Sequence, residues 1–251
     1  MGKPTFSVII PTLNEEVYLP KLLGSLVDQT KKNFEVIVVD GASTDETVEV
    51  VRSFGKKIPK LTIIKSKKAN LPLQRNLGGK KAVGEWLVFV DADAILLPTF
   101  FDRVEQFIER ENPRLFTSWS RPDSEVAADA LLSLLANMLI EGSIIFHRAL
   151  SPGSLTIVHR DEFRKISGYN ESLSFAEDYD FGQRLIATGI ELKVLRETLY
   201  VWSLRRLRKE GKLKMLQFYT TLALRTLITK KPPKGVRSYI MGGHLYEKEK
   251  P

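Results

Sequence analysis

The sequence predicts an α/β fold, an open and mostly parallel sheet flanked by helices. Short apolar runs rich in strand-forming residues recur through the N-terminal half, and stretches with helical spacing separate them. One unit of strand, helix and next strand takes about 25 to 30 residues, which suits right-handed crossovers between parallel strands. The strand-like runs lie at residues 6–10, 34–39, 61–64 and 86–90.

Start signals for two helices support this order of elements. Asn14 precedes a leucine-rich segment, residues 19–26, and is expected to cap that helix. Ser43 or Thr44 is expected to do the same for a helical segment around Val48. Both segments fall between strand-like runs, as the predicted crossovers require.

Composition favours one folded domain and excludes several kinds of site. The 251 residues are 43% hydrophobic, which is enough to bury the core of an α/β domain. The absence of cysteine excludes thiolate metal sites, a cysteine nucleophile and a disulfide framework, and it favours a reducing compartment. The start "MGKPTFSVII" enters the first strand at once, so no signal peptide is expected.

The apolar segments are shorter than a membrane span. The longest two, at 130–140 and 215–224, have 11 and 10 residues and are bounded by charged residues. A transmembrane helix needs about 20 apolar residues. We therefore expect no transmembrane segment.

Two carboxylates follow the fourth strand-like run directly. The segment "WLVFVDAD" ends in Asp91 and Asp93, and alternate residues of an extended chain point the same way. Both carboxylates can therefore face one hard cation, and oxygen ligands suit Mg²⁺ or Mn²⁺. A D-x-D spacing also arises by chance, so the position at a strand end carries this prediction.

Three polar segments are expected to meet at one edge of the sheet. "PTLNEE" follows the first strand, Asp40 and "GASTDET" follow the second, and the pair Asp91 and Asp93 follows the fourth. Ligands of open α/β sheets bind beyond the carboxyl ends of the strands. Neither a G-x-G-x-x-G loop nor a Walker A loop is present, which disfavours a dinucleotide or P-loop site.

Four segments resemble, in order, the motifs of glycosyltransferase family 2. They read "SVIIPTLNEE", "EVIVVDGASTDET", "QRNLGGKKAVGEWLVFVDADA" and "GYNESLSFAEDYDFGQRL", and together they span residues 7–185. The resemblance implies the GT-A fold, which is a Rossmann-like nucleotide-diphospho-sugar transferase fold with a mixed, mostly parallel sheet. It also implies a nucleotide-sugar donor, either a UDP-sugar or a GDP-sugar, together with Mn²⁺ or Mg²⁺.

The same resemblance assigns the donor residues. Pro11, Glu15 and Asp40 would contact the nucleoside, with Asp40 facing the base. Asp91 and Asp93 would form the D-x-D motif, with Asp93 as the direct metal ligand. On this basis we divide the chain into a catalytic domain, 1–202, and a basic amphipathic extension, 203–251. Within the domain, 1–95 is the nucleotide-sugar half and 96–202 the acceptor and catalytic-base half.

Arg75 has two possible roles. It precedes "NLGGKKA", where two glycines would allow close backbone approach and basic groups would lie near the donor diphosphate. Alternatively, Arg75 is a structural ion-pair partner of Asp91 or Asp40. Lys80 and Lys81 fit a solvated helix face.

A second acidic cluster stands at the start of a predicted helix. Glu177, Asp178 and Asp180 lie within four residues of "FAEDYDFGQRL", where the helix dipole favours anions. Crowded carboxylates shift one another's pKa, which suits a general base. By resemblance Asp178 is that base and activates the acceptor for one inverting displacement. Glu177 would support it, and Asp180 would cap the helix.

Positive charge is concentrated at the C-terminal end. From residue 203 onward there are 13 lysines and arginines against 3 glutamates, and the other 202 residues hold 25 basic and 27 acidic ones. Residues 203–230 mix basic and apolar groups at helical spacing, which suits a helix on an anionic membrane surface or one packed on the domain. The apolar stretch from Ala130 to Leu150 could form a lipid groove, but helical spacing favours a core helix.

Arg205 and Arg206 follow Asp178 closely enough to return to the site, and we favour Arg206 as a contact to donor or acceptor phosphate. Where processive family members carry Q-x-x-R-W, this chain has "WSLRRLRKEG", which lacks the glutamine. We therefore expect the addition of a single sugar.

The sequence thus predicts a metal-dependent inverting glycosyltransferase, cytoplasmic or peripheral on the cytoplasmic face of the membrane. The acceptor would be a glycan or a polyprenyl phosphate. A nucleotidylyltransferase would need a Gly-rich loop where "PTLNEE" stands. The remaining alternatives are an inactive homologue and a basic protein that binds membranes or nucleic acid, although no nucleic-acid motif is visible.

Overall fold

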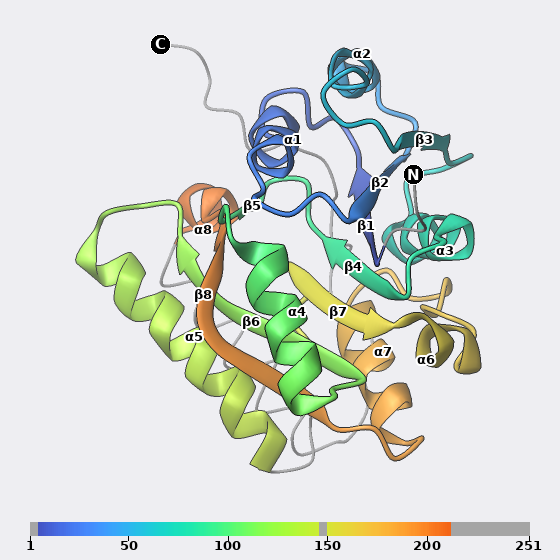
Figure 1. Ribbon diagram of the computed structural model, residues 1–251. Coiled ribbons are helices and arrows are strands. Elements are labelled where there is room, and N and C mark those ends of the chain that lie inside the picture. Colours follow the sequence, from blue (N-terminus) through green and yellow to red (C-terminus); the bar gives the residue numbers. More distant parts are fainter. Residues whose placement is uncertain (1–4, 146–149, 212–251) are drawn as a thin grey trace.

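The computed structural model describes residues 5–145 and 150–211, and a single mixed sheet organises them (Figure 1). The eight strands of this sheet lie in the order β3-β2-β1-β4-β7-β6-β8-β5. Strands β1 to β4 are parallel neighbours, β7 is antiparallel to β4 and β6, and β6 runs parallel to β8. Their bounds are β1 Phe6–Thr12, β2 Phe34–Asp40, β3 Leu61–Lys65, β4 Trp86–Val90, β5 Ile95–Leu96, β6 Leu115–Pro122, β7 Leu155–His159 and β8 Leu192–Trp202.

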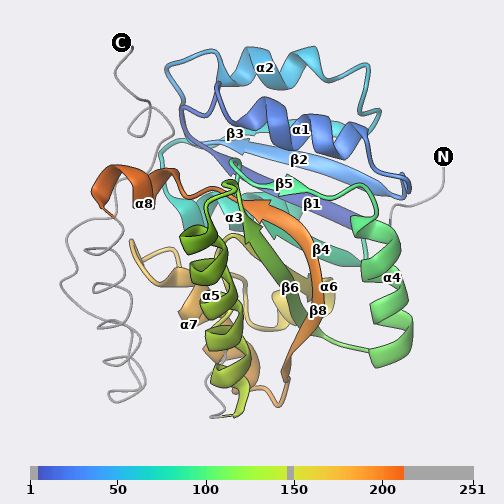
Figure 2. The ribbon, with the colours of Figure 1, turned by 90° about the vertical axis from the view of Figure 1, so that its left-hand side faces the viewer.

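Helices cover both faces of the sheet (Figure 2). One face packs against α1 Leu19–Val27, α2 Thr47–Ser53 and α4 Phe100–Glu111, and the other against α3 Leu71–Lys81, α6 Arg160–Lys165 and α7 Glu177–Ile186. Two further helices, α5 Ala127–Ile145 and α8 Arg205–Glu210, lie beside β6 and β8. The sheet runs unbroken from the N-terminal half of the chain into the second half, because β7 pairs with β4.

Alternation along the strands explains their continuous apolar runs. Val8 and Ile10 of β1 belong to the cluster under α1, whereas Ile9 belongs to the cluster under α3, and all three side chains are fully buried. A strand covered on both faces is apolar at nearly every position. The four strand-like runs of the sequence therefore correspond to β1, β2, β3 and β4.

The expected helix caps are wrong. Helix α1 begins at Leu19 after Tyr18, and α2 begins at Thr47 after Glu46, with no side-chain cap at either start. Asn14 instead adopts a left-handed backbone (φ 52°), and its Oδ1 accepts from the amide of Thr44 at 2.7 Å. The polar residues after β1 and β2 thus join the two loops to each other.

The apolar segment expected in the core is largely exposed. As far as Ile145 the segment lies in α5, but Leu131, Met138 and Leu139 are 56–59% exposed, so its assignment as a core helix is wrong. Within the described residues α5 is also long and apolar enough, by length and composition alone, to cross a membrane. The apolar segment 130–140 predicted a shorter helix, because the helix continues past Glu141.

Gly78 lets α3 lie close to the sheet, and its replacement tests that packing. A Cβ at Gly78 would lie 2.4 Å from Cγ2 of the buried Ile9. We expect Gly78→Ala to lower the free energy of unfolding by about 1 to 3 kcal/mol, because overpacking forces side chains and backbone to shift. Urea denaturation measures the change.

The matched control is Gly24→Ala in α1, where a Cβ would meet nothing within 4 Å. This substitution should raise stability by roughly 0.5 to 1 kcal/mol, the helix preference of alanine over glycine. Equal effects of the two substitutions would contradict close packing at Gly78.

Candidate active site

The carboxyl ends of β1, β2 and β4 form the floor of the site. Thr12 ends β1 opposite Asp40 at the end of β2, and the Gly41 amide donates to the Thr12 carbonyl at 2.8 Å. The side-chain amide nitrogen of Gln74, in α3, donates to the carbonyls of Thr12 and Val39, at 2.8 Å each. The two strand ends are thereby held at a fixed separation.

The residues predicted to contact a nucleoside lie on this floor. Pro11 is buried in β1, and Asp40, only 3% exposed, accepts from the amide of Ser43 with both carboxylate oxygens at 3.3 Å. Ala42, which follows β2, has a positive φ of 69° that a non-glycine residue rarely adopts. The loop after β2 is therefore held in an uncommon conformation beside Asp40.

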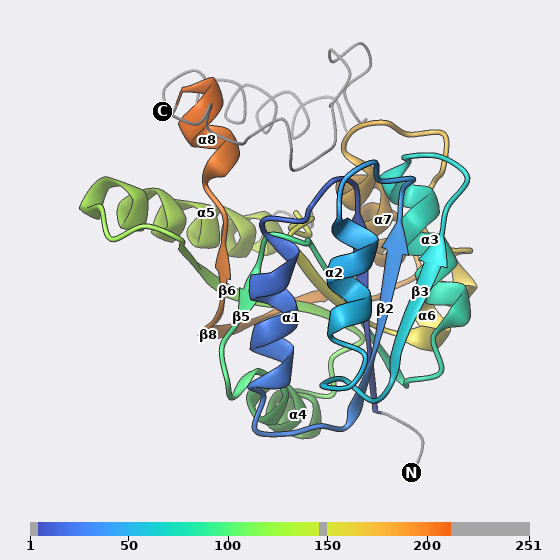
Figure 3. The same cartoon turned by 90° about the horizontal axis from the view of Figure 1, so that it is seen from above.

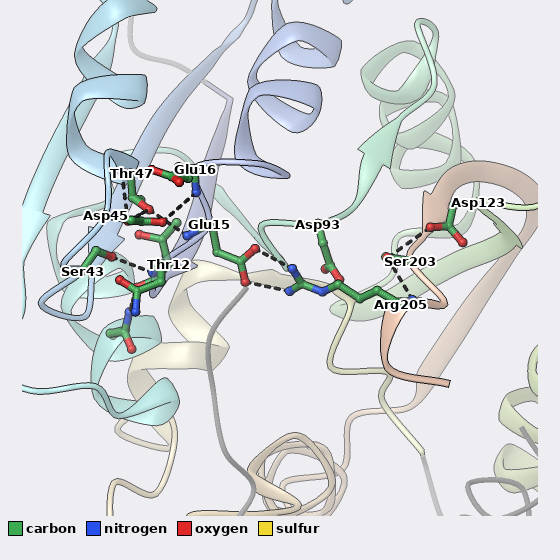
Figure 4. A network of polar contacts seen from close by, with 12 residues as sticks. Thr12, Glu15, Glu16, Ser43, Asp45, Thr47, Asp93, Asp123, Ser203 and Arg205 are labelled. Carbon is green, nitrogen blue, oxygen red and sulfur yellow. Dashed lines mark hydrogen bonds and ion pairs between the residues drawn. The ribbon is translucent and has the colours of Figure 1, made fainter. Parts of the chain in front are cut away.

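Glu15 and Asp93 are joined by one arginine (Figure 4). Arg205, the first residue of α8, donates to both carboxylate oxygens of Glu15 at 2.7 Å, and its Nε lies 2.9 Å from Asp93 Oδ2. Its guanidinium carbon stacks 4.4 Å from the ring centroid of Tyr18. Helix α8 thus contacts the loops that follow β1 and β4.

Arg205, and not the favoured Arg206, contacts Glu15 and Asp93, while a contact between Arg206 and phosphate stays a prediction. The Nε of Arg206 lies 2.9 Å from Glu210 Oε1, one turn along α8. Successive helical residues point about 100° apart, so only one of two adjacent arginines can face Glu15 and Asp93. The helix start at Arg205 selects that residue.

A second arginine, Arg75, lies almost completely buried at the centre of the site. It donates to Glu177 Oε1 at 2.9 Å, to Asp91 Oδ1 at 3.3 Å and to the Gly153 carbonyl at 2.9 Å. Tyr169 lies below the guanidinium, 5.1 Å from its carbon. Arg75 therefore forms the ion pair with Asp91 that one alternative expected, and Asp40 is not among these partners. A contact of Arg75 with a donor diphosphate stays a prediction.

Asp178 is placed next to this cluster by α7. Ala176, before the helix, has a left-handed backbone (φ 56°), and the amide of Tyr179 donates to Asp178 Oδ1 at 2.7 Å. A Cβ at Gly153 would lie only 2.8 Å from Asp178 Oδ2. The absence of a side chain at Gly153 is what allows the loop before β7 to approach the carboxylate.

The other acids of this segment have separate partners. Glu177 is held by Arg75, as a supporting residue would be, whereas Asp180 accepts from Arg184 Nε at 2.7 Å. No side chain caps α7, so the expected capping role of Asp180 is wrong. A carboxylate at this position can reach one turn forward to an arginine as readily as back to the helix start.

Confinement of acids raises several pKa values in the site. Withdrawal from water raises the pKa of Asp91 to about 6 against the effect of Arg75, and likewise raises the pKa of Asp93 to about 6 against Arg205. Burial, with the neighbouring Glu177 charge added, raises the pKa of Asp178 above the ordinary carboxyl range. Burial also raises the pKa of Glu15.

The donor set fits a hard cation only in part. Asp91 and Asp93 offer carboxylate oxygens, and a positively charged group already lies against each of them. Among residues 5–145 and 150–211, however, no group of three or more His, Cys, Asp or Glu side chains is arranged to hold a metal ion. A cation here would therefore need oxygens from a bound ligand or from water.

The glycines of "NLGGKKA" serve packing within the fold. Gly78 faces Ile9 and Gly79 faces Phe163 of α6, so neither glycine makes room for a ligand phosphate. Lys80 and Lys81 are exposed in the last turn of α3, as expected for a solvated helix face. The two glycines therefore do not have the expected role of letting a ligand approach the backbone.

Sequence reasoning missed three residues of the site. Gly153 and Tyr169 contact Arg75, and Tyr18 contacts Arg205. Tyr169 stands at the start of the fourth family motif, but neither Gly153 nor Tyr18 falls within any of the four motifs. The segment "SPGS", with Pro152 and Gly153 between two serines, has the composition of a turn and precedes β7. No sequence signal indicated that this turn would meet Asp178.

Comparison with known proteins identifies a family. Residues 7–133 match the family model described as glycosyl transferase family 2. An uncharacterized glycosyltransferase of Haemophilus influenzae is 29% identical over 184 residues, which cover 72% of this chain and 61% of that protein. The poly(ribitol-phosphate) β-N-acetylglucosaminyltransferase TarS of Staphylococcus aureus is 30% identical over 209 residues, covering 80% of this chain and 36% of TarS. The chain thus spans less than two thirds of either relative.

Solved structures confirm the GT-A type of fold. A crystal structure of Staphylococcus aureus TarS in complex with UDP-GlcNAc superposes with a TM-score of 0.67 at 26% identity, over 79% of this chain and 58% of that one. The mannosyltransferase PcManGT of Pyrobaculum calidifontis, in complex with GDP-Man and Mn²⁺, gives a TM-score of 0.67 over 93% of this chain and 67% of that one. At 21% identity the second likeness concerns the fold alone.

Removal of the Arg75 charge should destabilise the fold. We expect Arg75→Met to cost about 3 to 5 kcal/mol in urea unfolding, because Glu177 and Asp91 would lose a buried counter-charge. Arg103→Met is the control, since Arg103 pairs with Glu197 at a site where its side chain is 41% exposed. That substitution should cost far less, because water screens an exposed ion pair. Similar costs for both would show that Arg75 does not organise the site.

Proposed function

The chain belongs to glycosyltransferase family 2, and we propose that it transfers one sugar from a UDP-sugar or GDP-sugar to an acceptor. The acceptor group would be a hydroxyl or a lipid phosphate, and the reaction metal-dependent, inverting and non-processive. One observation carries the proposal: Arg75 connects Asp91 of the D-x-D pair to Glu177, the neighbour of Asp178. Asp91 and the acid next to the expected base thus share one buried counter-charge.

The donor would lie along the strand ends. Pro11, Glu15 and Asp40 border the place where the nucleoside would bind, and the diphosphate would extend toward Asp91 and Asp93. A cation held between these carboxylates and the diphosphate would stabilise the charge that develops on the departing phosphate. Arg205 faces the same place and would contact the diphosphate after release from Asp93.

The acceptor would approach from the side of Asp178. A carboxylate with a raised pKa can accept the proton of an acceptor hydroxyl as that oxygen attacks the anomeric carbon. One in-line displacement inverts the anomeric configuration and needs no covalent enzyme intermediate. Glu177, fixed by Arg75, would hold the first turn of α7 and so orient Asp178.

We place the reaction in the cytoplasm, with peripheral contact at the cytoplasmic face of the membrane through 203–230 as part of the proposal. A polyprenyl-phosphate acceptor would account for that basic segment, whereas a soluble glycan would not require it. Residues 212–230 lie outside the described part of the chain.

Donor binding is the direct test of this function. Melting temperature is measured with UDP-glucose, UDP-GlcNAc, UDP-galactose and GDP-mannose, each with Mn²⁺, Mg²⁺ or EDTA. A ligand that binds only the folded state raises the melting temperature. A shift with one donor that disappears in EDTA supports the proposal, and no shift with any donor contradicts it.

Substitutions at Asp93 and Arg205 test whether these two residues bind the metal and the donor. Asp93→Ala should abolish metal-dependent donor binding while the fold is retained. Arg205→Gln should tighten Mn²⁺ binding several-fold in the absence of donor, because a competing positive charge leaves Asp93, and should weaken binding of the donor diphosphate. Calorimetric titration with Mn²⁺, then with donor, measures both effects.

Arg206→Gln is the matched control, since Arg206 contacts Glu210 on the same helix. It should leave Mn²⁺ affinity unchanged. Unaltered Mn²⁺ and donor affinities in Arg205→Gln would remove Arg205 from the donor site.

Asp178→Asn should keep donor binding and lose transfer by about 10² to 10⁴-fold, the usual contribution of a general base. In the unmodified enzyme only the deprotonated carboxylate can act as base. Because the pKa of Asp178 is raised, kcat should rise with pH through a midpoint well above the ordinary aspartate value of about 4. Initial rates measured between acidic and neutral pH show this rise of kcat.

Asp180→Asn is the control, because Asp180 pairs with Arg184 away from Arg75. It should retain most of the transfer rate. Near-normal transfer by Asp178→Asn would show that another group is the base.

A further inference from the structure

Helix α5 turns its polar side toward the sheet. Asp129, Ser133 and Asn137 recur every four residues, and they are 2%, 2% and 5% exposed. Asn137 accepts from the amide of Ser120 at 3.1 Å and donates to the Ser120 carbonyl at 2.9 Å. The register between β6 and β8 shifts around Trp119, and a bulge of this kind disrupts the ladder. The asparagine therefore supplies polar partners at an irregular place in the sheet.

Further polar contacts fix the rotation of α5 about its axis. Ser133 donates to the Ser120 carbonyl at 3.1 Å, and Glu141 accepts from Trp119 Nε1 at 2.8 Å and from Arg196 Nε at 2.9 Å. To bury its leucines instead, the helix would have to rotate and break all of these contacts. Burial of unpaired polar groups is costly, so the polar face stays inside.

The outward face of α5 is consequently aliphatic. Figure 3 shows the helix at the edge of the fold, outside β6 and β8. No charged residue occurs between Asp129 and Glu141. The exposed fractions are Leu131 57%, Leu134 46%, Leu135 48%, Met138 59%, Leu139 56% and Ile145 78%. A contiguous apolar surface of this kind marks a place of contact with a partner or a membrane.

The charge of the neighbouring chain indicates which partner fits. Leu207 of α8 and the preceding Leu204 pack together with Leu132 of α5, so the described start of the basic segment 203–251 lies beside this helix. That segment carries 13 basic and 3 acidic residues. An aliphatic surface beside concentrated positive charge is what an anionic bilayer accommodates. A second copy of the chain would bring two such basic segments together, which like-charge repulsion disfavours.

We propose that the outward face of α5 lies on the surface of an anionic lipid bilayer, with the helix axis parallel to the membrane plane. The leucines and methionine would enter the boundary between headgroups and acyl chains while the polar face remains on β6. Basic side chains of 203–251 would contact the lipid headgroups. The helix cannot span the bilayer in this fold, because one side of it is hydrogen bonded to the domain.

A single reporter separates this proposal from the alternatives. The chain has no cysteine, so Leu135→Cys in the full chain can be labelled with a polarity-sensitive fluorophore. Vesicles of phosphatidylcholine with phosphatidylglycerol should shift its emission to the blue, whereas vesicles of phosphatidylcholine alone should have a smaller effect. A label at Val83→Cys, on another exposed apolar residue, should not respond.

Other outcomes of the labelling overturn the proposal. Blue emission without vesicles that grows with protein concentration would assign the face to a second copy of the chain. Blue emission without vesicles at every concentration would assign it to residues of the chain's own 212–251 segment. No response to anionic vesicles would exclude the bilayer contact.

Paired substitutions provide an independent test by vesicle co-sedimentation. Leu134→Gln with Leu135→Gln should weaken partitioning into anionic vesicles by about tenfold or more, because apolar surface no longer leaves water. Val17→Gln with Val83→Gln is the matched control, since these side chains are 49% and 45% exposed on other elements. Equal partitioning of both variants, with unchanged melting temperatures, would show that α5 does not contact lipid. Because no donor is present, the result is separate from that of the transfer assays.

Discussion

The buried guanidinium of Arg75 is the constraint on which the candidate site depends. It connects three parts of the chain that are distant in sequence, namely the end of β4, the loop before β7 and the start of α7. Arginine suits this place because its planar fork presents several donors in fixed directions and keeps its charge when buried. A lysine would offer a point charge without the same geometry. The acids on either side of Arg75 are therefore positioned by one side chain.

The strands and the acidic clusters could be predicted because each has a local signal. A strand covered on both faces needs an uninterrupted apolar run, and the run that ends in Asp91 and Asp93 became β4 with both carboxylates at its rim. Glu177 and Asp178 were recognisable because three acids stand together at a helix start. Motif resemblance added the roles of these residues, which spacing alone does not provide.

Other features depend on rotations and distant partners that a sequence does not display. The choice between Arg205 and Arg206 follows from where α8 begins, and helix starts are poorly defined by sequence. Leucines at helical spacing in α5 correctly indicated a helix, but the periodicity does not say which side faces the protein. Asparagine is a common helix cap, yet the side chain of Asn14 bonds to Thr44, which lies 30 residues away in the next loop.

The position of Arg205 in the sequence also decides when its contacts can form during synthesis of the chain. Its contact with Glu15 spans 190 residues of sequence, and it follows β8, the last strand in the described chain. Synthesis proceeds from the N-terminus, and contacts of long sequence separation form late. The loops after β1 and β4 are therefore synthesised well before the arginine that contacts them. Until then Glu15 and Asp93 lack that counter-charge, and the loops after β1 and β4 carry negative charge that no arginine of α8 balances.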